Sequence, residues 1–230
     1  MPINNNLPDK NFPMKMKWGS PPTAFIDAIG AITVTLMDCT SRDDVMRYLP
    51  SFSLATWEDK PRDTGYYTDE EKVQCIKDLF QFKLLPNAME TIRFTFLVSN
   101  IDLVDVTHLI RHRTMSFSAH CTGDRDQRDD ACLVKPSISN SGYYKEYIDV
   151  MQRAKELYAK MVDSKAISIL DARTILPRSL ENHYYASVSL KDLIPYFNQR
   201  LDKQIQPESD NIIAMRMLNH VARVFPEIKY

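Results

Sequence analysis

The sequence has 230 residues, of which 44% are hydrophobic and 26% charged, and its formal net charge at pH 7 is −1. These values exclude wholesale disorder, and the near-neutral charge provides no general field that would attract nucleic acid or an anionic membrane. No apolar run approaches the roughly 18 residues that a membrane-spanning helix needs. We therefore expect a soluble globular protein that binds anions only through local clusters, with no nucleic-acid or membrane partner.

The first predicted elements follow an arm over residues 1–22, which is rich in asparagine and proline. A strand is predicted over residues 28–37 from their Ile, Val and Thr content, and Ser41 is expected to cap a short helix. Thr68-Asp-Glu-Glu71 is a capping box, which predicts a helix that continues to about Lys83. Residues 92–98 alternate between apolar and other side chains, which is typical of a strand with one buried face.

The second half of the chain begins with helical spacing of apolar residues over 101–113. A polar stretch over 116–130 predicts a long loop, and long loops inside compact domains often have a function. Residues 143–162 form an amphipathic pattern whose Tyr and Met stripe favours the core or a subunit interface. The last expected elements are a strand over 184–190 and helices over 191–200 and 207–224.

The order of these elements predicts the fold class. Strands and helices are mixed without regular βαβ alternation, which favours an α+β domain over a doubly wound parallel sheet. We find no internal repeat and no low-complexity linker, so one domain is expected over residues 23–230.

The cysteines give an expectation about the compartment. Cys39, Cys75, Cys121 and Cys132 stand at irregular spacings, and the chain shows no secretory leader. This usage predicts free thiols in the reducing cytoplasm. The Cys and His residues are not arranged in pairs at the usual ligand spacing, so no metal site is predicted.

A basic segment is the first candidate for chemistry. Arg111, His112 and Arg113 end the helix predicted over 101–113, and His108 shares a helical face with Arg111 and His112. Guanidinium groups bind phosphate through two parallel hydrogen bonds, so a nucleotide or cofactor phosphate is a suitable guest. The alternative is a basic helix end that interacts only with its own helix dipole.

The same segment resembles a family motif. His108-Leu-Ile-Arg-His-Arg-Thr-Met-Ser116 is similar to the Gln-x-x-Arg-His-Arg motif of the flavin-dependent thymidylate synthases, with its serine three residues beyond the last Arg. Glu90-Thr-Ile-Arg-Phe-Thr-Phe96 resembles the family's Glu-His-x-x-Phe-Thr-Phe strand. Ala172-Arg-Thr-Ile-Leu-Pro177 resembles its Ala-Arg-x-x-Leu-Pro block, and residues 200–208 match the spacing of its Arg…Ala-Gln-x-Glu segment. Four blocks in the right order are much more specific than any one of them.

The resemblance implies a fold and a reaction. The fold is a single α+β domain with a small mixed or antiparallel sheet and flanking helices, assembled as a homotetramer whose sites are shared between subunits. The reaction transfers a one-carbon group from 5,10-methylenetetrahydrofolate to C5 of a pyrimidine deoxynucleoside monophosphate, by default dUMP. The cofactor is FAD, which NADPH reduces.

The resemblance also implies roles for single residues. Arg200 is the catalytic residue, which lies against the pyrimidine and favours ionisation at N3, since a fixed guanidinium stabilises charge that develops on the ring. Arg173 holds the nucleotide from a neighbouring subunit. The implied flavin-binding residues are Asn87, Glu90, Arg111, His112, Arg113, Ser116, Ser189 and Lys191. The implied nucleotide-binding residues are His108, Arg111, Cys121, Thr122, Gly123, Arg173 and Arg200.

Departures from the family pattern gather on the nucleotide side. His108 replaces a Gln, Ala119 replaces a Glu, and Cys121-Thr-Gly-Asp124 replaces Ser-x-Arg-Tyr, which removes the phosphate-binding Arg at its register. Arg125 and Arg128 are the alternatives that a slightly longer loop would offer. On the flavin side, the departures are Leu85, Thr91 and Pro195.

These departures leave three interpretations of the function beside the default. One is a dCMP substrate, another is hydroxymethyl transfer, and the third is a relative that binds flavin or nucleotide after losing catalysis. Loss of a buried hydrogen-bond acceptor, such as the Glu that Ala119 replaces, changes which polar edge of the pyrimidine the site can bind. Such a change discriminates strongly between substrates. Cys121 has two interpretations as well: a thiolate that attacks C6 of the pyrimidine, or a small residue whose backbone N–H binds phosphate.

Overall fold

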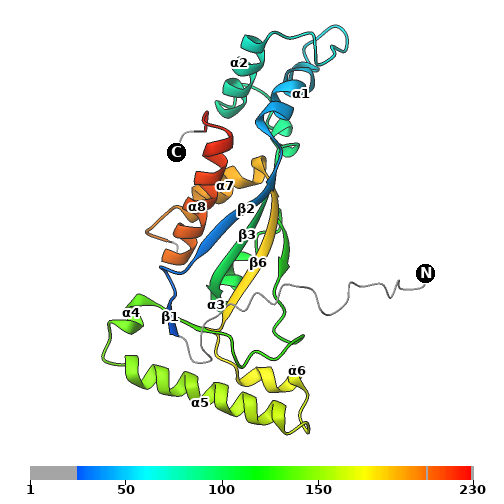
Figure 1. The fold of residues 1–230 in the computed structure, drawn as a ribbon. Helices are drawn as coiled ribbons and strands as arrows, with labels where there is room; N and C mark the ends of the chain where they lie inside the picture. The colour runs from blue at the N-terminus through cyan, green and yellow to red at the C-terminus, as the bar shows by residue number, and fades with distance from the viewer. Residues whose placement is uncertain (1–24, 206, 229–230) are drawn as a thin grey trace, which may run out of the picture. The chain divides into compact units, whose positions relative to one another are not determined.

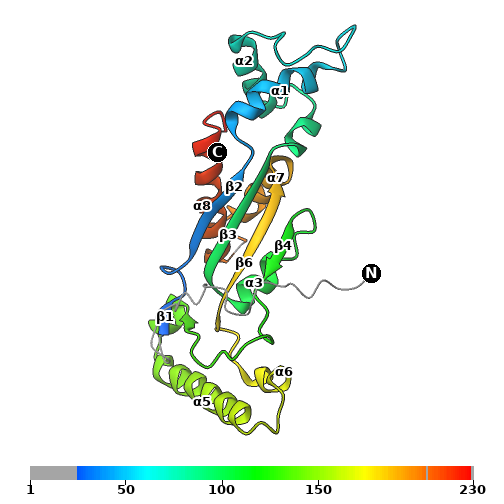
Figure 2. The same ribbon diagram turned by 45° about the vertical axis from the view of Figure 1, so that its right-hand side comes forward.

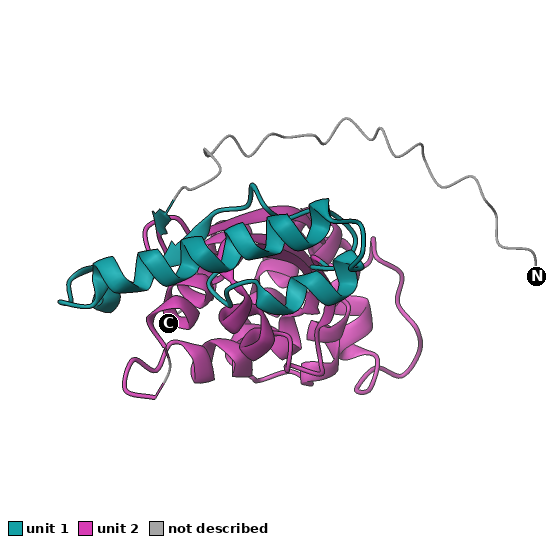
Figure 3. Ribbon diagram, turned by 90° about the horizontal axis from the view of Figure 1, so that it is seen from below, with its two compact units in different colours: residues 1–26, 121–181 teal, residues 27–120, 182–230 magenta. Residues whose placement is uncertain are grey.

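The computed structural model describes residues 25–205 and 207–228, so the arm predicted over 1–22 and Gln206 lie outside the described residues. The chain divides into two compact units, which Figure 3 shows in two colours. Unit 1 contains residues 25–26 and 121–181, and unit 2 contains residues 27–120 and the chain from 182 onward. Whether 23–230 folds as one domain stays a prediction. In the described part, no helix is both long and apolar enough to cross a bilayer.

Unit 2 is built on a four-stranded sheet in the order β2-β3-β6-β4. The strands are β2 (Thr33–Cys39), β3 (Arg93–Asp102), β6 (Glu181–Ser189) and β4 (Ser116–Ala119). β2 pairs antiparallel with β3, and β4 pairs antiparallel with β6, where Ser116 lies opposite Ser187. Figure 2 shows β4 beside β6 at the edge of the sheet.

Two of the helices of unit 2 cover one face of this sheet. β3 alternates as predicted, and its inward side chains Phe94, Phe96 and Val98 are fully buried. They form one core with the apolar faces of α7 (Leu190–Arg200) and α8 (Glu208–Val224), which lie side by side on the sheet (Figure 1). The short helix α3 (Leu103–Leu109) adds Val106 and Leu109 to the same core.

Two further helices of unit 2 start where the sequence predicts. Ser41 caps α1 (Arg42–Leu54), and its side chain accepts a hydrogen bond from the Asp44 N–H. The capping box of Thr68 and Glu71 is formed at the start of α2 (Asp69–Phe80). Proline then opens the 3₁₀ helix η1 (Pro86–Glu90), which places Asn87 and Glu90 on the surface.

Unit 1 is dominated by the long helix α5 (Tyr144–Asp163), as the amphipathic pattern predicts. Its most buried residue, Tyr158, accepts a hydrogen bond from the Gln127 N–H at 3.2 Å. The smaller elements of unit 1 are α4 (Pro136–Ser139), α6 (Ile169–Ala172), η2 (Arg173–Ile175) and the two-stranded sheet of β1 (Phe25–Asp27) and β5 (Cys132–Val134).

The α+β class is confirmed, whereas three local predictions are wrong. The strand predicted over 28–37 begins only at Thr33, because residues 28–31 form a turn with a hydrogen bond from the Ala31 N–H to Asp27 O. The helix predicted over 101–113 ends at Leu109, so Arg111, His112 and Arg113 lie in the following turn and not on a helical face. This turn is closed by a hydrogen bond from the His112 N–H to Leu109 O. The loop predicted over 116–130 begins as β4, because these residues pair with β6. Pairing with a strand more than 60 residues away has no local sequence signal.

Candidate functional site

Arg200 lies at the last residue of α7 and is 4% exposed. Its Nε and Nη2 atoms donate to Nε2 of His112 at 2.9 and 2.8 Å. Its Nη1 atom donates to Oδ2 of Asp210 at 2.6 Å and lies 3.3 Å from Nε2 of His108. We call these four residues the Arg200 cluster. The structure thus brings together the predicted catalytic residue and two of the predicted binding residues.

Each member of the Arg200 cluster comes from a different part of unit 2. His108 stands on the last turn of α3, His112 in the turn beyond it, and Asp210 in the first turn of α8. The Asn211 side chain donates to the Arg200 carbonyl at 2.6 Å, which ties the end of α7 to the start of α8. The guanidinium is therefore held from several sides before any ligand binds.

The environment of His112 keeps its imidazole neutral. Burial, the Arg200 cation and His108 together lower the pKa of His112 to about 4. An Nε2 atom that accepts hydrogen bonds from Arg200 has no proton of its own, so the proton of the neutral ring is on Nδ1. Its ring also packs edge-on against Tyr196, with the ring centres 5.0 Å apart.

We expect the stability of the fold to decrease in acid because of His112. The unfolded chain takes up a proton on this residue near pH 6.5, whereas the folded protein does so only near pH 4. The stabilising contribution is therefore present above about pH 6.5 and is lost as the pH falls toward about 4. An NMR titration of the imidazole Cε1–H signal, assigned with His112→Gln, measures the midpoint. A midpoint at the ordinary value near 6.5 would contradict the buried, Arg200-bonded environment.

The other predicted flavin-binding residues are mostly exposed. Arg111, Arg113 and Ser116 are exposed in the turn after α3 and at the start of β4. Lys191 forms an ion pair with Glu90, which links α7 to η1. Ser189 is buried and caps α7, since its hydroxyl accepts from the Asp192 N–H at 3.2 Å. A flavin contact of Ser189 stays a prediction beside this capping role.

Within unit 2 the predicted flavin-binding residues form two groups. Lys191 lies in the first turn of α7, where it pairs with Glu90 of η1. His112 contacts Arg200, which is the last residue of α7. Lys191 and Arg200 are nine residues apart, so these groups are about 14 Å apart along the helix at 1.5 Å per residue. A single chain therefore presents two separate contact regions, as an extended ligand or a site shared between subunits requires.

In unit 1, the loop of Cys121, Thr122 and Gly123 contacts Arg173. The Arg173 Nη1 atom donates to Oγ1 of Thr122 at 3.4 Å and lies 4.0 Å from Sγ of Cys121. Its Nε donates to the Leu170 carbonyl at 3.1 Å, which fixes the side chain over the end of α6. The loop thus brings three predicted nucleotide-binding residues to Arg173, which is a fourth, within one chain. That Arg173 serves a neighbouring subunit stays a prediction.

Gly123 permits this close approach because it has no side chain. A Cβ atom at this position would lie 2.6 Å from Arg173 Nη1 and 2.6 Å from Leu170 Cδ2. Both distances are far below van der Waals contact, so any larger residue would displace the guanidinium. The backbone of the Cys121–Gly123 loop and one arginine therefore form a small cationic surface.

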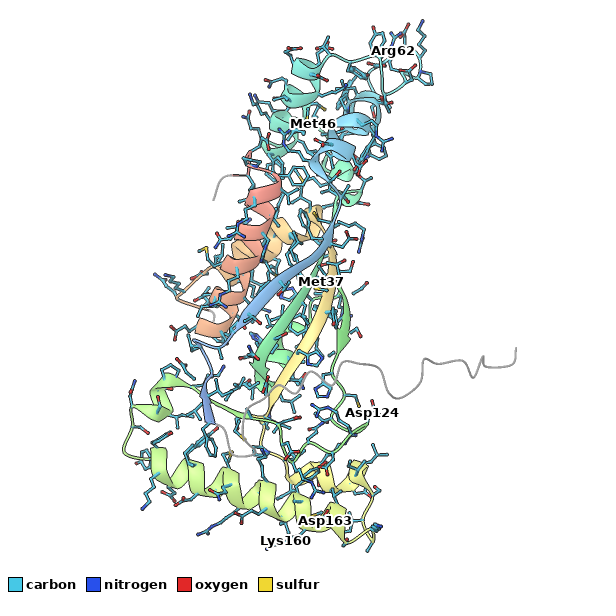
Figure 4. All side chains as sticks on the ribbon, viewed as in Figure 1. Met37, Met46, Arg62, Asp124, Lys160 and Asp163 are labelled. Carbon is cyan, nitrogen blue, oxygen red and sulfur yellow. The ribbon has the colours of Figure 1, made fainter. Side chains whose placement is uncertain are left out.

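The two alternative phosphate ligands have partners of their own. Arg125 donates two hydrogen bonds to the Asp130 carboxylate, at 2.9 and 2.7 Å. Arg128 pairs with Asp126 and with Asp163, and Figure 4 shows Asp163 at the end of α5. Both guanidinium groups face carboxylates, whereas Arg173 faces a hydroxyl, a thiol and a backbone carbonyl. Arg173 is therefore the better phosphate ligand of the three.

Asp210 is the member of the Arg200 cluster that the sequence did not identify. It is completely buried, and it lies two residues beyond the Glu208 that carries the motif resemblance. An acidic residue in the first turn of a helix is common for electrostatic reasons alone. Only the packing of α8 against α7 distinguishes this carboxylate from an ordinary helix-start residue.

Comparisons with known proteins identify the family and the fold of this chain. The sequence model of the family "Thymidylate synthase complementing protein" matches residues 35–227. The flavin-dependent thymidylate synthase of Sulfolobus acidocaldarius is 27% identical over 163 residues, which are 70% of this chain and 61% of that protein. The Geobacter sulfurreducens enzyme of the same name is 28% identical over 145 residues, 62% of each chain. The matched region thus spans about three fifths of these relatives.

Solved structures show the same fold. The UMP/dUMP methylase PolB from Streptomyces cacaoi, bound with 5-Br dUMP, aligns with a TM-score of 0.71 and 21% identity over 89% of this chain and 94% of that chain. Its complex with 5-Br UMP aligns with a TM-score of 0.68 and 21% identity, over 90% and 95% of the two chains. The names of the sequence relatives state a flavin dependence for those proteins. With the family match covering most of the chain, this protein belongs to the thymidylate synthase complementing protein family, as a divergent flavin-dependent thymidylate synthase relative.

Proposed function

We propose that this protein transfers a one-carbon group from 5,10-methylenetetrahydrofolate to C5 of a pyrimidine deoxynucleoside monophosphate in the cytoplasm. The default substrate is dUMP, the cofactor is FAD, and NADPH is the reductant. Family membership supports the reaction class, and the four free cysteines fit a reducing compartment. The single observation that carries the proposal is the pairing of Arg173 with the Cys121–Gly123 loop.

This pairing supports a subsite for the nucleotide phosphate. The Arg173 guanidinium provides charge-assisted hydrogen bonds to a phosphate dianion, and the Thr122 hydroxyl lies beside it. Gly123 lets the loop backbone approach the same space, and Cys121 is exposed at its edge. The Cys121 thiol accepts a hydrogen bond from the Gly123 N–H at 3.4 Å, and both interpretations of this residue, nucleophile or small loop residue, stay predictions.

The Arg200 cluster supports a subsite for the base. The guanidinium is fixed by His112 and Asp210, and a fixed cation stabilises negative charge on a pyrimidine that is activated at C5. His108, whose side chain is 40% exposed, is the member of the cluster most open to a ligand. It stands where the family motif has Gln, so it is also the residue on which the choice between dUMP and dCMP is expected to depend.

The residues present fit a flavin dinucleotide. Arg111, Arg113 and Lys191 are exposed cations, and Asn87 adds an exposed amide, which suits a ligand with two phosphates and polar ring edges. When bound, the flavin supplies the reducing electrons of the reaction. The protein binds the flavin phosphates, orients the pyrimidine and holds positive charge at its polar edge.

Helix α5 supports the proposed homotetramer. Tyr143 at the N-cap and Val150 and Leu157 within the helix recur every seventh residue and are 75%, 51% and 46% exposed. Exposed apolar side chains at this spacing favour an interaction site, and the proposed sharing of sites needs another copy of this chain. Sedimentation analysis of Leu157→Glu against wild type tests this assignment, since a charge at this position should favour smaller species.

The test of the function is an absorbance spectrum of the purified protein, titrated with dUMP and then with dCMP. We expect a flavin band near ~450 nm that shifts with one of the two nucleotides, which names the substrate. Turnover with methylenetetrahydrofolate and NADPH then separates methyl from hydroxymethyl transfer by product mass. A flavin-bound protein without turnover would support the catalytically lost relative. A colourless protein that FAD does not reconstitute would contradict the flavin assignment.

A further inference from the structure

Asp210 contacts the catalytic arginine from a completely buried position. Its Oδ2 atom accepts from Arg200 Nη1 at 2.6 Å and lies 3.1 Å from Nδ1 of His108. The exposed fractions of the Arg200 and Asp210 side chains are 5% and 0%. No ligand therefore touches Asp210 directly in this arrangement, and any effect of this residue on a reaction passes through its neighbours.

The contacts around Asp210 fix the protons of the cluster. An imidazole with its proton on Nδ1 donates to Asp210 and can accept from Arg200 at Nε2. The opposite tautomer would place a lone pair of His108 against the carboxylate and an N–H against the guanidinium. His112 accepts from the other side of Arg200 in the same way. Asp210 thus sets the orientation of His108, and both together set the plane of the guanidinium.

We infer that Asp210 is the positioning residue of Arg200, and that it acts with His108 to hold the guanidinium in the plane that the pyrimidine needs. This inference rests on the proposed function, in which Arg200 faces the base. Misplacement of a catalytic group by about 1 Å costs on the order of 100-fold in rate, so a residue that never touches the substrate can control turnover. Binding of the phosphate and of the flavin depends on other residues.

The test compares kcat, KM and nucleotide affinity of Asp210→Asn with those of the wild type. Asparagine keeps the shape of the side chain and removes the charge that orients Arg200 and His108. We expect kcat to fall by about 10- to 100-fold, with KM for the nucleotide and flavin content within about twofold. Asp210→Glu, which keeps the carboxylate, should recover part of the rate. Ser209→Ala is the matched control, because it alters the same helix start through a hydroxyl bonded to Asp105.

A second comparison shows whether Asp210 acts through Arg200. In an Arg200→Lys background, Asp210→Asn should cause a much smaller further loss of kcat, since the guanidinium geometry is already absent. Equal losses in both backgrounds, or a rise in KM without a change in kcat, would overturn the inference. Should Asp210→Asn unfold, Asp210→Glu in the wild-type and Arg200→Lys backgrounds provides the same comparison. A wild type that turns over neither dUMP nor dCMP contradicts the proposed function, whereas an active wild type with an equally active Asp210→Asn contradicts only the positioning role.

Discussion

Replacing Arg200 with alanine is expected to lower the free energy of unfolding by about 3–5 kcal/mol, because the Asp210 carboxylate is left buried without its guanidinium. Urea unfolding followed by circular dichroism at pH 7 measures this loss, with every variant at the same protein concentration. Arg47→Ala is the matched control. Arg47 also pairs with an aspartate, but both side chains of that pair are more than half exposed. Its loss should cost less than about 1 kcal/mol.

The pH dependence gives this prediction a second, independent signature. Burial raises the pKa of Asp210, and the Arg200 cation opposes that rise. Without Arg200, the folded variant binds a proton on Asp210 more tightly than the unfolded chain does. A raised folded pKa gives stability that is present at low pH and lost at high pH. The deficit of Arg200→Ala should therefore shrink as the pH falls from 7 toward 5. A deficit that equals that of Arg47→Ala would mean that the buried pair does not form.

This expectation changes how the role of Arg200 can be tested. Alanine at this position removes a suspected catalytic group and a structural partner together, so lost activity alone would not separate the two. Arg200→Lys keeps a cation near Asp210 but loses the planar fork that reaches His112 as well. A folded Arg200→Lys with a strongly reduced kcat would therefore assign the guanidinium geometry to the reaction.

The sequence predicted correctly those elements whose physical cause lies within a few neighbouring residues. The capping box at Thr68 and the alternation over 92–98 each contain their own physical cause within a few residues. The end of α3 was missed because apolar residues continue at helical spacing into Ile110, while the chain turns to bring His112 to Arg200. A tertiary contact determines that turn, and no residue near it indicates the contact.

The candidate site shows the same division. The resemblance identified Arg200, His108 and His112, which the structure places within hydrogen-bond distance. It did not identify Asp210, because burial and the packing of α8 give that carboxylate its role. The contact between Gly123 and Arg173 joins residues that are 50 positions apart, and the sequence suggested it only through separate motif matches. A contact between such distant residues requires the folded chain.

Replacing Arg173 with alanine is expected to weaken dUMP binding by about 10- to 100-fold, since one charge-assisted contact to phosphate contributes about 1.5–3 kcal/mol. Isothermal titration with dUMP measures this loss, and titration with deoxyuridine, which has no phosphate, should show little change. Gly123→Ala should weaken dUMP in the same direction, because its Cβ would lie 2.6 Å from the guanidinium nitrogen and displace it.

Arg128→Ala is the control that distinguishes Arg173 from a general effect of positive charge. Arg128 lies in the same unit, but its guanidinium is occupied by Asp126 and Asp163. Its removal should change the affinity for dUMP by less than about twofold, as is usual for a partly exposed charge that is already paired. If Arg128→Ala lost the affinity and Arg173→Ala kept it, the loop around Asp124 would have to rearrange on binding. The phosphate would then lie beside the Cys121–Asp124 stretch, which replaces Ser-x-Arg-Tyr of the family motif. Arg173 would have only its structural contacts to Leu170 and Thr122.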